Sequence, residues 1–371
     1  MNRVAEPNRT SDHGILIVSL IMAGIGVLMV YDASAVSAAL RDKFSDQYYF
    51  LFRQALWMFV GIITMVLMSK IPIESIQRFI LPALLLNIIL LILVLVPGIG
   101  VEAGGARRWL RLGPVSMQPG EPIRLLLPVY LATFFQRRRS EIRSFRRVLL
   151  PVALVTVSVA FLLILQPKVS SALLITVLAT VLFFVAGIPI WQMLVLGLSG
   201  LPLLALNLDR FHYIYQRLTA WLDPSSHVKG LAYQSTQSLI AIGSGGFFGV
   251  GLGQGRQKMF YLPEAHTDFI FSVIGEELGF IGALALLGGF TFLFIRGIQL
   301  SLRLEQFVDK LLAFAMTTLV LFPVFVNTMV ATGLFPVTGV PLPLISFGGS
   351  ALVTDMTALG ILSGLARKLP A

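Results

Sequence analysis

Five ionisable side chains lie close together where a long polar segment runs into a strongly apolar one. They are Glu264, His266, Asp268, Glu276 and Glu277. A charged side chain inside hydrocarbon costs at least about 2.5–3.5 kcal/mol, so residues of this kind are functional candidates. Carboxylates in such a place can act as general bases or relay protons.

The spacing of the acids indicates which of them could act together. Asp268 opens the apolar run, where its local alternative role is that of a helix N-cap. Glu276 lies eight residues further on, roughly 12 Å along a helix and within about 80° of the face of Asp268. Glu277 falls on the opposite side. We therefore expect Glu276 to share a cavity with Asp268, and Glu277 to pair with a neighbouring helix.

The elements that must position these groups are membrane helices. The chain has 371 residues, of which 56% are hydrophobic and 12% charged, whereas soluble domains are about 25% charged. The apolar runs are continuous, which argues against a β-barrel. We predict one all-α polytopic domain over 1–371, with a large extracytoplasmic loop at 209–267. Its ten expected spans are 14–33, 54–70, 76–97, 119–136, 148–166, 170–187, 190–208, 268–296, 309–332 and 347–366.

The distribution of basic residues predicts the orientation. The densest run lies between the fourth and fifth spans: Arg137, Arg138, Arg139, Arg143, Arg146 and Arg147. By the positive-inside rule this side is cytoplasmic, and an even number of spans puts both termini there. Cytoplasmic lysines and arginines alone could explain the net charge of +10. Other basic residues nevertheless fall on the outer side. An anionic substrate or anionic lipid headgroups would explain them. Nucleic acid is not an expected partner, because the basic residues are scattered among membrane loops.

Several outer segments carry candidate binding residues with structural alternatives. Arg53 enters the second span and could simply snorkel to the interface. Glu121 and Arg124 are three residues apart on one helix face, and can form an ion pair. The glycine-rich run 243–255 lacks the context of a dinucleotide fingerprint or a P-loop. Its expected use is close backbone approach, either to a helix or to a diphosphate.

Taken together, these residues suit a lipid-linked anion. Basic side chains would hold a diphosphate, the apolar body would hold its chain, and a carboxylate would act as general base. The same residues would also suit a proton-coupled transporter. The chain has no cysteine, and His266 has no helical histidine partner for a zinc site. The residues alone leave both functions open.

Four long motifs resemble the SEDS family of membrane proteins. They are LPEAHTDFIFSVIGEELG (262–279), ARRWLRLG (106–113), QPGEPIRL (118–125) and TGVPLPLISFGGSAL (338–352). The likeness covers essentially all the spans. The amino-acid sequence around residue 268 is closer to that of division-type members than to that of elongation-type members. The family pattern has an acid where this chain has Lys168, which removes one group that could bind a cation.

The resemblance implies a ten-span peptidoglycan glycosyltransferase in the cytoplasmic membrane, with its active site facing outward. It would polymerise lipid II into a nascent glycan strand during septal wall synthesis. Its partners would be a class B penicillin-binding protein and other divisome membrane proteins. The alternatives are a lipid II flippase, an elongation-type polymerase or a non-catalytic division scaffold.

The family motifs also assign roles to residues. Asp268 matches the essential acidic residue and is expected to be the general base. The expected substrate- or diphosphate-binding residues are Arg53, Arg107, Arg108, Glu121, Arg124, His266 and Glu276. A divalent cation, magnesium or manganese, is the one candidate cofactor, and its ligands are unassigned.

Overall fold

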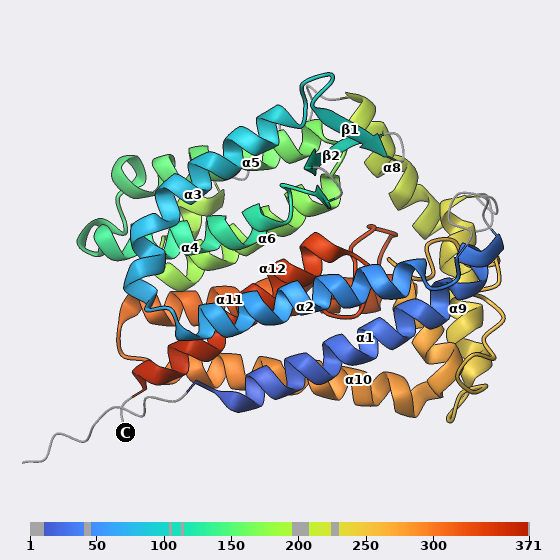
Figure 1. Cartoon of the computed structure of the whole chain (residues 1–371). Helices are drawn as coiled ribbons and strands as arrows, with labels where there is room; N and C mark the ends of the chain where they lie inside the picture. The colour runs from blue at the N-terminus through green and yellow to red at the C-terminus, as the bar shows by residue number, and fades with distance from the viewer. Residues whose placement is uncertain are drawn as a thin grey trace, which may run out of the picture.

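The computed structural model describes residues 11–40, 46–103, 106–112, 115–194, 208–223 and 230–369. Most of these residues lie in long helices packed side by side (Figure 1). The helices are α1 (His13–Leu40), α2 (Tyr49–Lys70), α3 (Ile73–Leu93), α4 (Pro122–Arg137), α5 (Leu150–Leu165), α6 (Val169–Ala186), α8 (Leu208–Leu222), α9 (Leu231–Gly245), α10 (Ile270–Arg303), α11 (Phe307–Ala331) and α12 (Gly349–Leu365).

Eight helical segments in the described part of the chain are long and apolar enough to cross a membrane. They correspond to eight of the ten predicted spans, so the polytopic helical class is confirmed. The fourth predicted span is the 16-residue helix α4, roughly 24 Å long and therefore shorter than a hydrocarbon core of about 30 Å. The seventh, 190–208, lies mostly outside the described residues. The loop 209–267 contains α9 and nearly all of α8.

One part of the outer loops is a small β-sheet, which the sequence did not predict. Strands β1 (Gly100–Ala103), β2 (Ala106–Leu112) and β3 (Val115–Met117) pair antiparallel in that order. The strands have four, seven and three residues, and β2 is rich in arginine. Such short charged strands carry little β-signal of their own, so pairing with neighbours decides their conformation.

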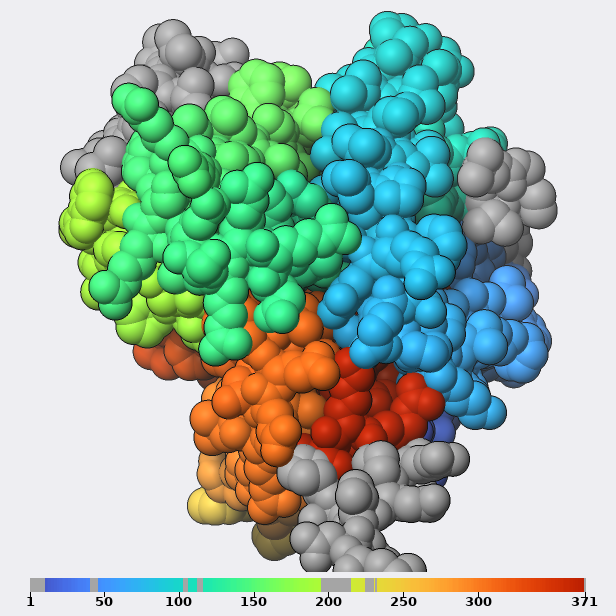
Figure 2. All heavy atoms as spheres, turned by 90° about the vertical axis from the view of Figure 1, so that its left-hand side faces the viewer, coloured from blue at the N-terminus to red at the C-terminus, as the bar shows by residue number. Residues whose placement is uncertain are grey.

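The connections expected on the cytoplasmic side do share one face of the molecule. Figure 2 shows the segment between α4 and α5 in green, the segment between α10 and α11 in orange and the end of α12 in red on the same face. The first of these carries the arginine run of residues 137–147. The arginine run therefore lies on the same face as the α10–α11 connection and the end of α12, as alternating spans require.

Helix α10 is broken at Gly279, and the glycine-rich run lies across the break. Gly279 has φ 67° and ψ −166° inside the helix, a conformation that favours glycine. The Phe280 N–H donates to the carbonyl of Gly246 at 2.9 Å, and the Val250 N–H to that of Glu276 at 3.0 Å. The expected close approach of the glycine run to a helix is thus confirmed.

Glycines also set the distance between α2 and the central helix α12. A side chain at Gly360 would meet the backbone of Met65, and one at Gly364 would meet the backbone of Ser69. Small residues allow this approach between membrane helices, where van der Waals contact drives association.

We predict that Gly360→Val will destabilise the protein by about 2 kcal/mol, since an overpacked contact forces the helix backbones apart. Gly288→Val is the matched control, because a Cβ there meets nothing within 4 Å. The measurement is the midpoint of thermal unfolding in detergent. Equal midpoints for the two variants would contradict this account of the α2–α12 contact.

Candidate functional site

Asp268 stands just before the spanning helix and does not cap it. Helix α10 begins at Ile270, its N-cap residue is Phe269, and no side chain makes a capping hydrogen bond. The carboxylate of Asp268 is half-buried and receives no hydrogen bond from the residues that the structure describes. The capping alternative is therefore wrong, and the carboxylate is available for chemistry.

The backbone around Asp268 is fixed to segments distant in sequence. The side-chain amide of Asn327, in α11, donates to the carbonyl of Asp268 at 2.7 Å and to that of Val340 at 2.8 Å. The Phe347 N–H donates to the carbonyl of His266 at 2.9 Å. The Asp268 segment is thus held against α11 and the proline-rich segment before α12.

The surroundings of Asp268 favour its protonated form more than water does. Burial, followed by the nearby charge of Glu264, raises the pKa of Asp268 to about 6, while the charges of Arg217 and Arg108 act in the opposite direction. Desolvation penalises the charged form of a carboxyl group. A pKa near 6 leaves the group ionised at neutral pH and able to accept a proton.

Arg107 and Arg108 are adjacent in strand β2, and their side chains have different surroundings. Arg107 faces outward, 44% exposed, and its Nε lies 3.5 Å from the carboxylate of Glu102. Successive residues of a strand point to opposite faces, and Arg108 is half-buried with its charge acting on Asp268. Of this predicted pair, the structure brings Arg108 to the site.

A second cluster is a closed set of buried ion pairs. The guanidinium of Arg124 lies 2.7 Å from Glu121 and 3.4 Å from Asp355, and the ammonium of Lys168 lies 2.8 Å from Glu121. All four side chains are at most 9% exposed. The predicted Glu121–Arg124 pair is confirmed. Their charges are thus already paired within the protein, and the predicted binding role of Glu121 and Arg124 stays a prediction.

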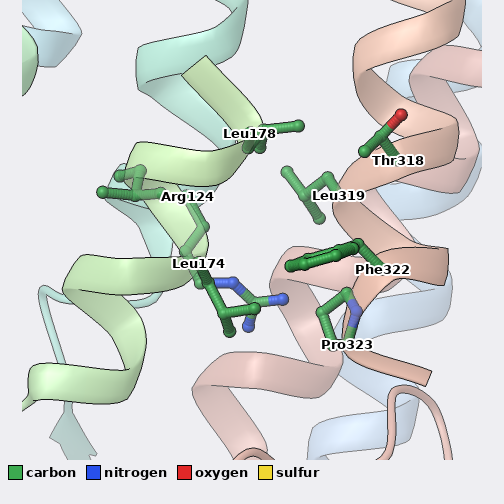
Figure 3. Close-up of a pocket in the computed structure, with 8 residues that line it drawn as sticks. Arg124, Leu174, Leu178, Thr318, Leu319, Phe322 and Pro323 are labelled. Carbon is green, nitrogen blue, oxygen red and sulfur yellow. The ribbon is translucent and has the colours of Figure 1, made fainter. Parts of the chain in front are cut away.

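A small pocket opens beside this cluster, between α6 and α11. It is lined by Arg124, Leu174, Ile175, Leu178, Thr318, Leu319, Phe322 and Pro323. In Figure 3, Leu174 and Leu178 of α6 face Leu319 and Phe322 of α11, and the guanidinium of Arg124 lies at one end. The lining is mainly apolar and does not include Asp268.

The start of α2 packs against the segment that carries Asp268. The ring of Phe50 lies 4.6 Å from that of His266, between centroids, and Phe347 packs against both. One turn further on, Arg53 donates to the hydroxyl of Tyr49 at 2.5 Å and lies over its ring. His266 therefore packs in an aromatic cluster, and Arg53 lies at its edge.

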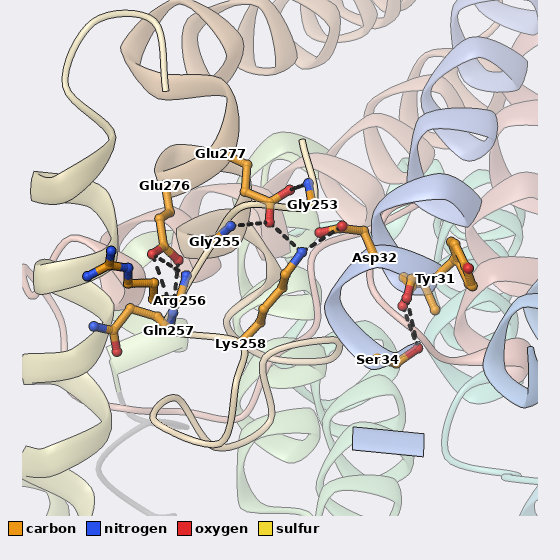
Figure 4. Close-up of polar contacts among 11 residues, drawn as sticks. Tyr31, Asp32, Ser34, Gly253, Gly255, Arg256, Gln257, Lys258, Glu276 and Glu277 are labelled. Carbon is orange, nitrogen blue, oxygen red and sulfur yellow. Dashed lines mark hydrogen bonds and ion pairs between the residues drawn. The ribbon is translucent and has the colours of Figure 1, made fainter. Parts of the chain in front are cut away.

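The expected role of Glu276 needs correction. Its side chain is 2% exposed, and its carboxylate accepts the N–H groups of Arg256 and Gln257 at 2.8–3.3 Å (Figure 4). It therefore fastens the loop that precedes the site and does not share a cavity with Asp268. Glu277 was expected to pair with a neighbouring helix, but its ion-pair partner is Lys258 of the loop. Its link to α1 is indirect, because Asp32 binds the same ammonium. The helical angle could not reveal the place of Glu276, because Asp268 lies before α10, which begins at Ile270.

Two residues near the site were not singled out from sequence. Arg217 of α8 donates to the carbonyl of Val337, and its charge acts on Asp268. Asp355 completes the buried cluster from the middle of α12. A signal for Asp355 was present, since it is the only charged residue in the predicted span 347–366 and charges inside spans are rarely incidental.

The described residues include no group of three or more His, Cys, Asp or Glu that could hold a metal ion. The acids of the buried cluster are occupied by Arg124 and Lys168. The described side chains around Asp268 therefore form no such group.

The chain is similar over nearly its whole length to a known protein family. The model of the FtsW, RodA and SpoVE family, described as a cell cycle protein, matches residues 12–370. A probable peptidoglycan glycosyltransferase FtsW from Trichlorobacter lovleyi is 37% identical, over 98% of this chain and 96% of its own. Stage V sporulation protein E from Bacillus subtilis is 37% identical, over 95% of this chain and 96% of its own.

Two solved structures share the fold. A chain of a peptidoglycan synthase complex that coordinates polymerisation and crosslinking matches with a TM-score of 0.76 and 31% identity, covering 96% of this chain and 98% of that one. The rod shape determining protein RodA of Thermus thermophilus matches with a TM-score of 0.67 and 30% identity, covering 97% and 98%.

We predict that Asp268 takes up a proton as the pH falls through about 6, well above the ordinary range of aspartate. The measurement is infrared difference spectroscopy of the purified protein, following the band of protonated carboxyl groups. Asp268→Asn should lack this component. A component that appears only near pH 4 would show that the carboxyl group is not desolvated as the structure indicates.

We also predict that Lys168→Met will destabilise the protein by about 3 kcal/mol, because it leaves a net negative charge in the buried cluster. The double variant Glu121→Gln/Lys168→Met keeps the cluster neutral and should regain much of this loss. Unfolding midpoints in detergent test both. If the double variant is as unstable as the single one, charge balance is not what holds this cluster.

Proposed function

Because the chain belongs to the cell cycle protein family of FtsW, RodA and SpoVE, we propose that this multi-pass membrane protein is a peptidoglycan glycosyltransferase that polymerises lipid II. The observation that carries the proposal is the half-buried carboxylate of Asp268, under the influence of two arginines that come from separate elements. The relatives named as glycosyltransferases support the reaction class.

The chemistry requires one base and one departing anion. Asp268 would take the proton from the sugar hydroxyl of one lipid-linked substrate, and the freed oxygen would attack the anomeric carbon of the other. A carbon–oxygen bond forms, the bond from that carbon to the diphosphate breaks, and undecaprenyl diphosphate leaves with the electron pair. A single displacement inverts the anomeric centre and needs no second carboxylate as nucleophile.

Arg108 and Arg217 are the side chains best placed to hold the diphosphate. Both carry charges that act on Asp268, and arginine matches the geometry of phosphate oxygens. Positive charge at the departing group stabilises the transition state where negative charge develops. Arg107, the exposed neighbour of Arg108 in β2, would contact the diphosphate from the outer side.

A divalent cation is a candidate aid to the diphosphate, but no step above passes through one. The described residues offer no group of acids for it, so such an ion would have to be held mainly by the substrate. Removal of divalent cations with a chelator, followed by addition of magnesium or manganese, tests this role.

The distribution of basic residues supports a proposed orientation in the membrane. The basic face that includes the α4–α5 connection (Figure 2) would lie in the cytoplasm, as the positive-inside rule requires. Asp268 would then face outward from the cytoplasmic membrane. A class B penicillin-binding protein is the proposed partner, supported by the match to a synthase complex that couples polymerisation to crosslinking. The wording near Asp268 and the FtsW relatives favour a division role.

The test is polymerisation of purified lipid II by the protein together with its penicillin-binding partner. Asp268→Asn is expected to lower the rate at least about a hundredfold, as general-base catalysis typically contributes that much or more. Glu102→Gln is the control. It removes an exposed carboxylate from the β-sheet that carries Arg108 and should leave the rate nearly unchanged.

Full activity of Asp268→Asn would reject the base assignment. Loss of activity in both variants would show that neutral substitutions on this side act through folding. A wild-type protein that binds its partner and moves lipid II across vesicles without joining sugars would instead be a flippase or a scaffold.

A further inference from the structure

Lys258 is a buried ammonium shared by two carboxylates from different helices. Its side chain is 3% exposed, and its Nζ lies 2.5 Å from Glu277 of α10 and 2.6 Å from Asp32 of α1. Figure 4 shows the lysine reaching from the loop between these two acids. The lysine therefore ties the loop before Asp268 to two membrane helices.

Glu277 and its neighbour Glu276 also hold the backbone of the loop next to Lys258. The carboxylate of Glu277 accepts the N–H groups of Gly253 and Gly255, both at 3.0 Å. That of Glu276 accepts those of Arg256 and Gln257. Each acid thus satisfies backbone groups of a loop that makes no regular secondary structure.

From Lys258 the chain reaches Asp268 through a short series of bonded turns. The Leu262 N–H donates to the carbonyl of Gln257 at 2.8 Å, and the Phe269 N–H to that of Glu264 at 3.3 Å. Phe260 and Glu264 hold φ values of 68° and 56°, which residues with side chains adopt only where their surroundings impose it. A shift at Lys258 would therefore be carried to the segment of Asp268.

We propose that Lys258, with Asp32 and Glu277, is a positioning residue that sets where Glu264 and Asp268 stand relative to Arg108 and Arg217. The proposal rests on the function proposed above. A buried ion pair is weak evidence for stability, since apolar residues of similar size often replace one without loss. Its best-supported use is to fix one arrangement among several, and here it fixes the loop that leads to Asp268.

The chain offers a matched control at another place. Lys368 also binds two carboxylates, Glu74 at 2.7 Å and Asp309 at 3.0 Å. It lies in the 3-10 turn Ala366–Lys368, directly after α12. Both lysines can be replaced by methionine, which removes the charge and keeps most of the length.

The experiment compares Lys258→Met, Lys258→Arg and Lys368→Met in lipid II polymerisation with the penicillin-binding partner. Lys258→Met should lower kcat about tenfold to a hundredfold, as misplaced catalytic groups do, with little change in KM. The acidic limb of its rate profile should move to lower pH, because the charge of Glu264 and the burial of Asp268 are relaxed. Lys258→Arg should recover most of the rate. Lys368→Met should keep both kcat and the acidic limb.

Hydrogen exchange gives a readout that does not need activity. Amides of the segment 250–262 should exchange faster in Lys258→Met than in wild type, and unchanged in Lys368→Met. If Lys258→Met does not fold, Asp32→Asn replaces it: it cuts the tie to α1, keeps the Lys258–Glu277 pair, and should change the same quantities less.

The outcomes separate the two proposals. If wild type polymerises lipid II and Asp268→Asn does not, unchanged kcat, acidic limb and exchange in Lys258→Met overturn the positioning role. If wild type does not polymerise at all, the proposed function fails, and faster exchange confined to the Lys258 variant would still show that this lysine holds the loop.

Discussion

The structure depends on one constraint, which is that charge inside an apolar bundle must be paired or hydrogen-bonded. An unpaired ion there would change protonation state or destabilise the fold. The chain meets this constraint with closed clusters. Arg124 and Lys168 neutralise Glu121 and Asp355, and Lys258 is shared by two acids elsewhere. Asp268 differs from these acids, because no ion pair or hydrogen bond occupies its carboxylate within the described residues.

The contrast explains how the site can be both rigid and reactive. One paired cluster joins the start of α4 to α12, and the other joins α1 to α10 through Lys258. The backbone bonds of Asn327 fix the segment of Asp268. The carboxylate of Asp268 remains without a hydrogen-bond partner among the described residues. Arginines from β2 and α8 carry charges that act on it. If Asp268 is the base, as proposed, this arrangement would keep positive charge near the substrate and leave the carboxylate able to accept a proton.

Much of this could be predicted from sequence, for identifiable reasons. The apolar runs are long, so the helices were found, and the i, i+3 spacing of Glu121 and Arg124 correctly indicated a pair. The glycine run correctly indicated close backbone approach. Glu276 was misplaced because Asp268 was assumed to lie in the same helix, whereas α10 begins at Ile270 and the loop backbone binds the carboxylate of Glu276. The contribution of Arg217 depends on how α8 packs, and no local pattern contains that information.

The short sheet shows a second limit. Arg107 and Arg108 look equivalent in sequence, and only strand pairing puts one outward and the other toward the site. Residue types thus suggested the chemistry, but the placement of single arginines required tertiary structure. The same holds for Lys168, whose charge in a short turn gave no indication that Glu121 would take it as a partner.

The most direct test of the central claim is the pH dependence of the rate at which purified protein and partner join lipid II under saturating substrate. With Asp268 as the single base, a plot of log rate against pH should rise with a slope of one below about pH 6 and be flat above it. A rate that stays constant down to pH 4.5, well below the pKa of about 6, would show that Asp268 is not the group that accepts the proton.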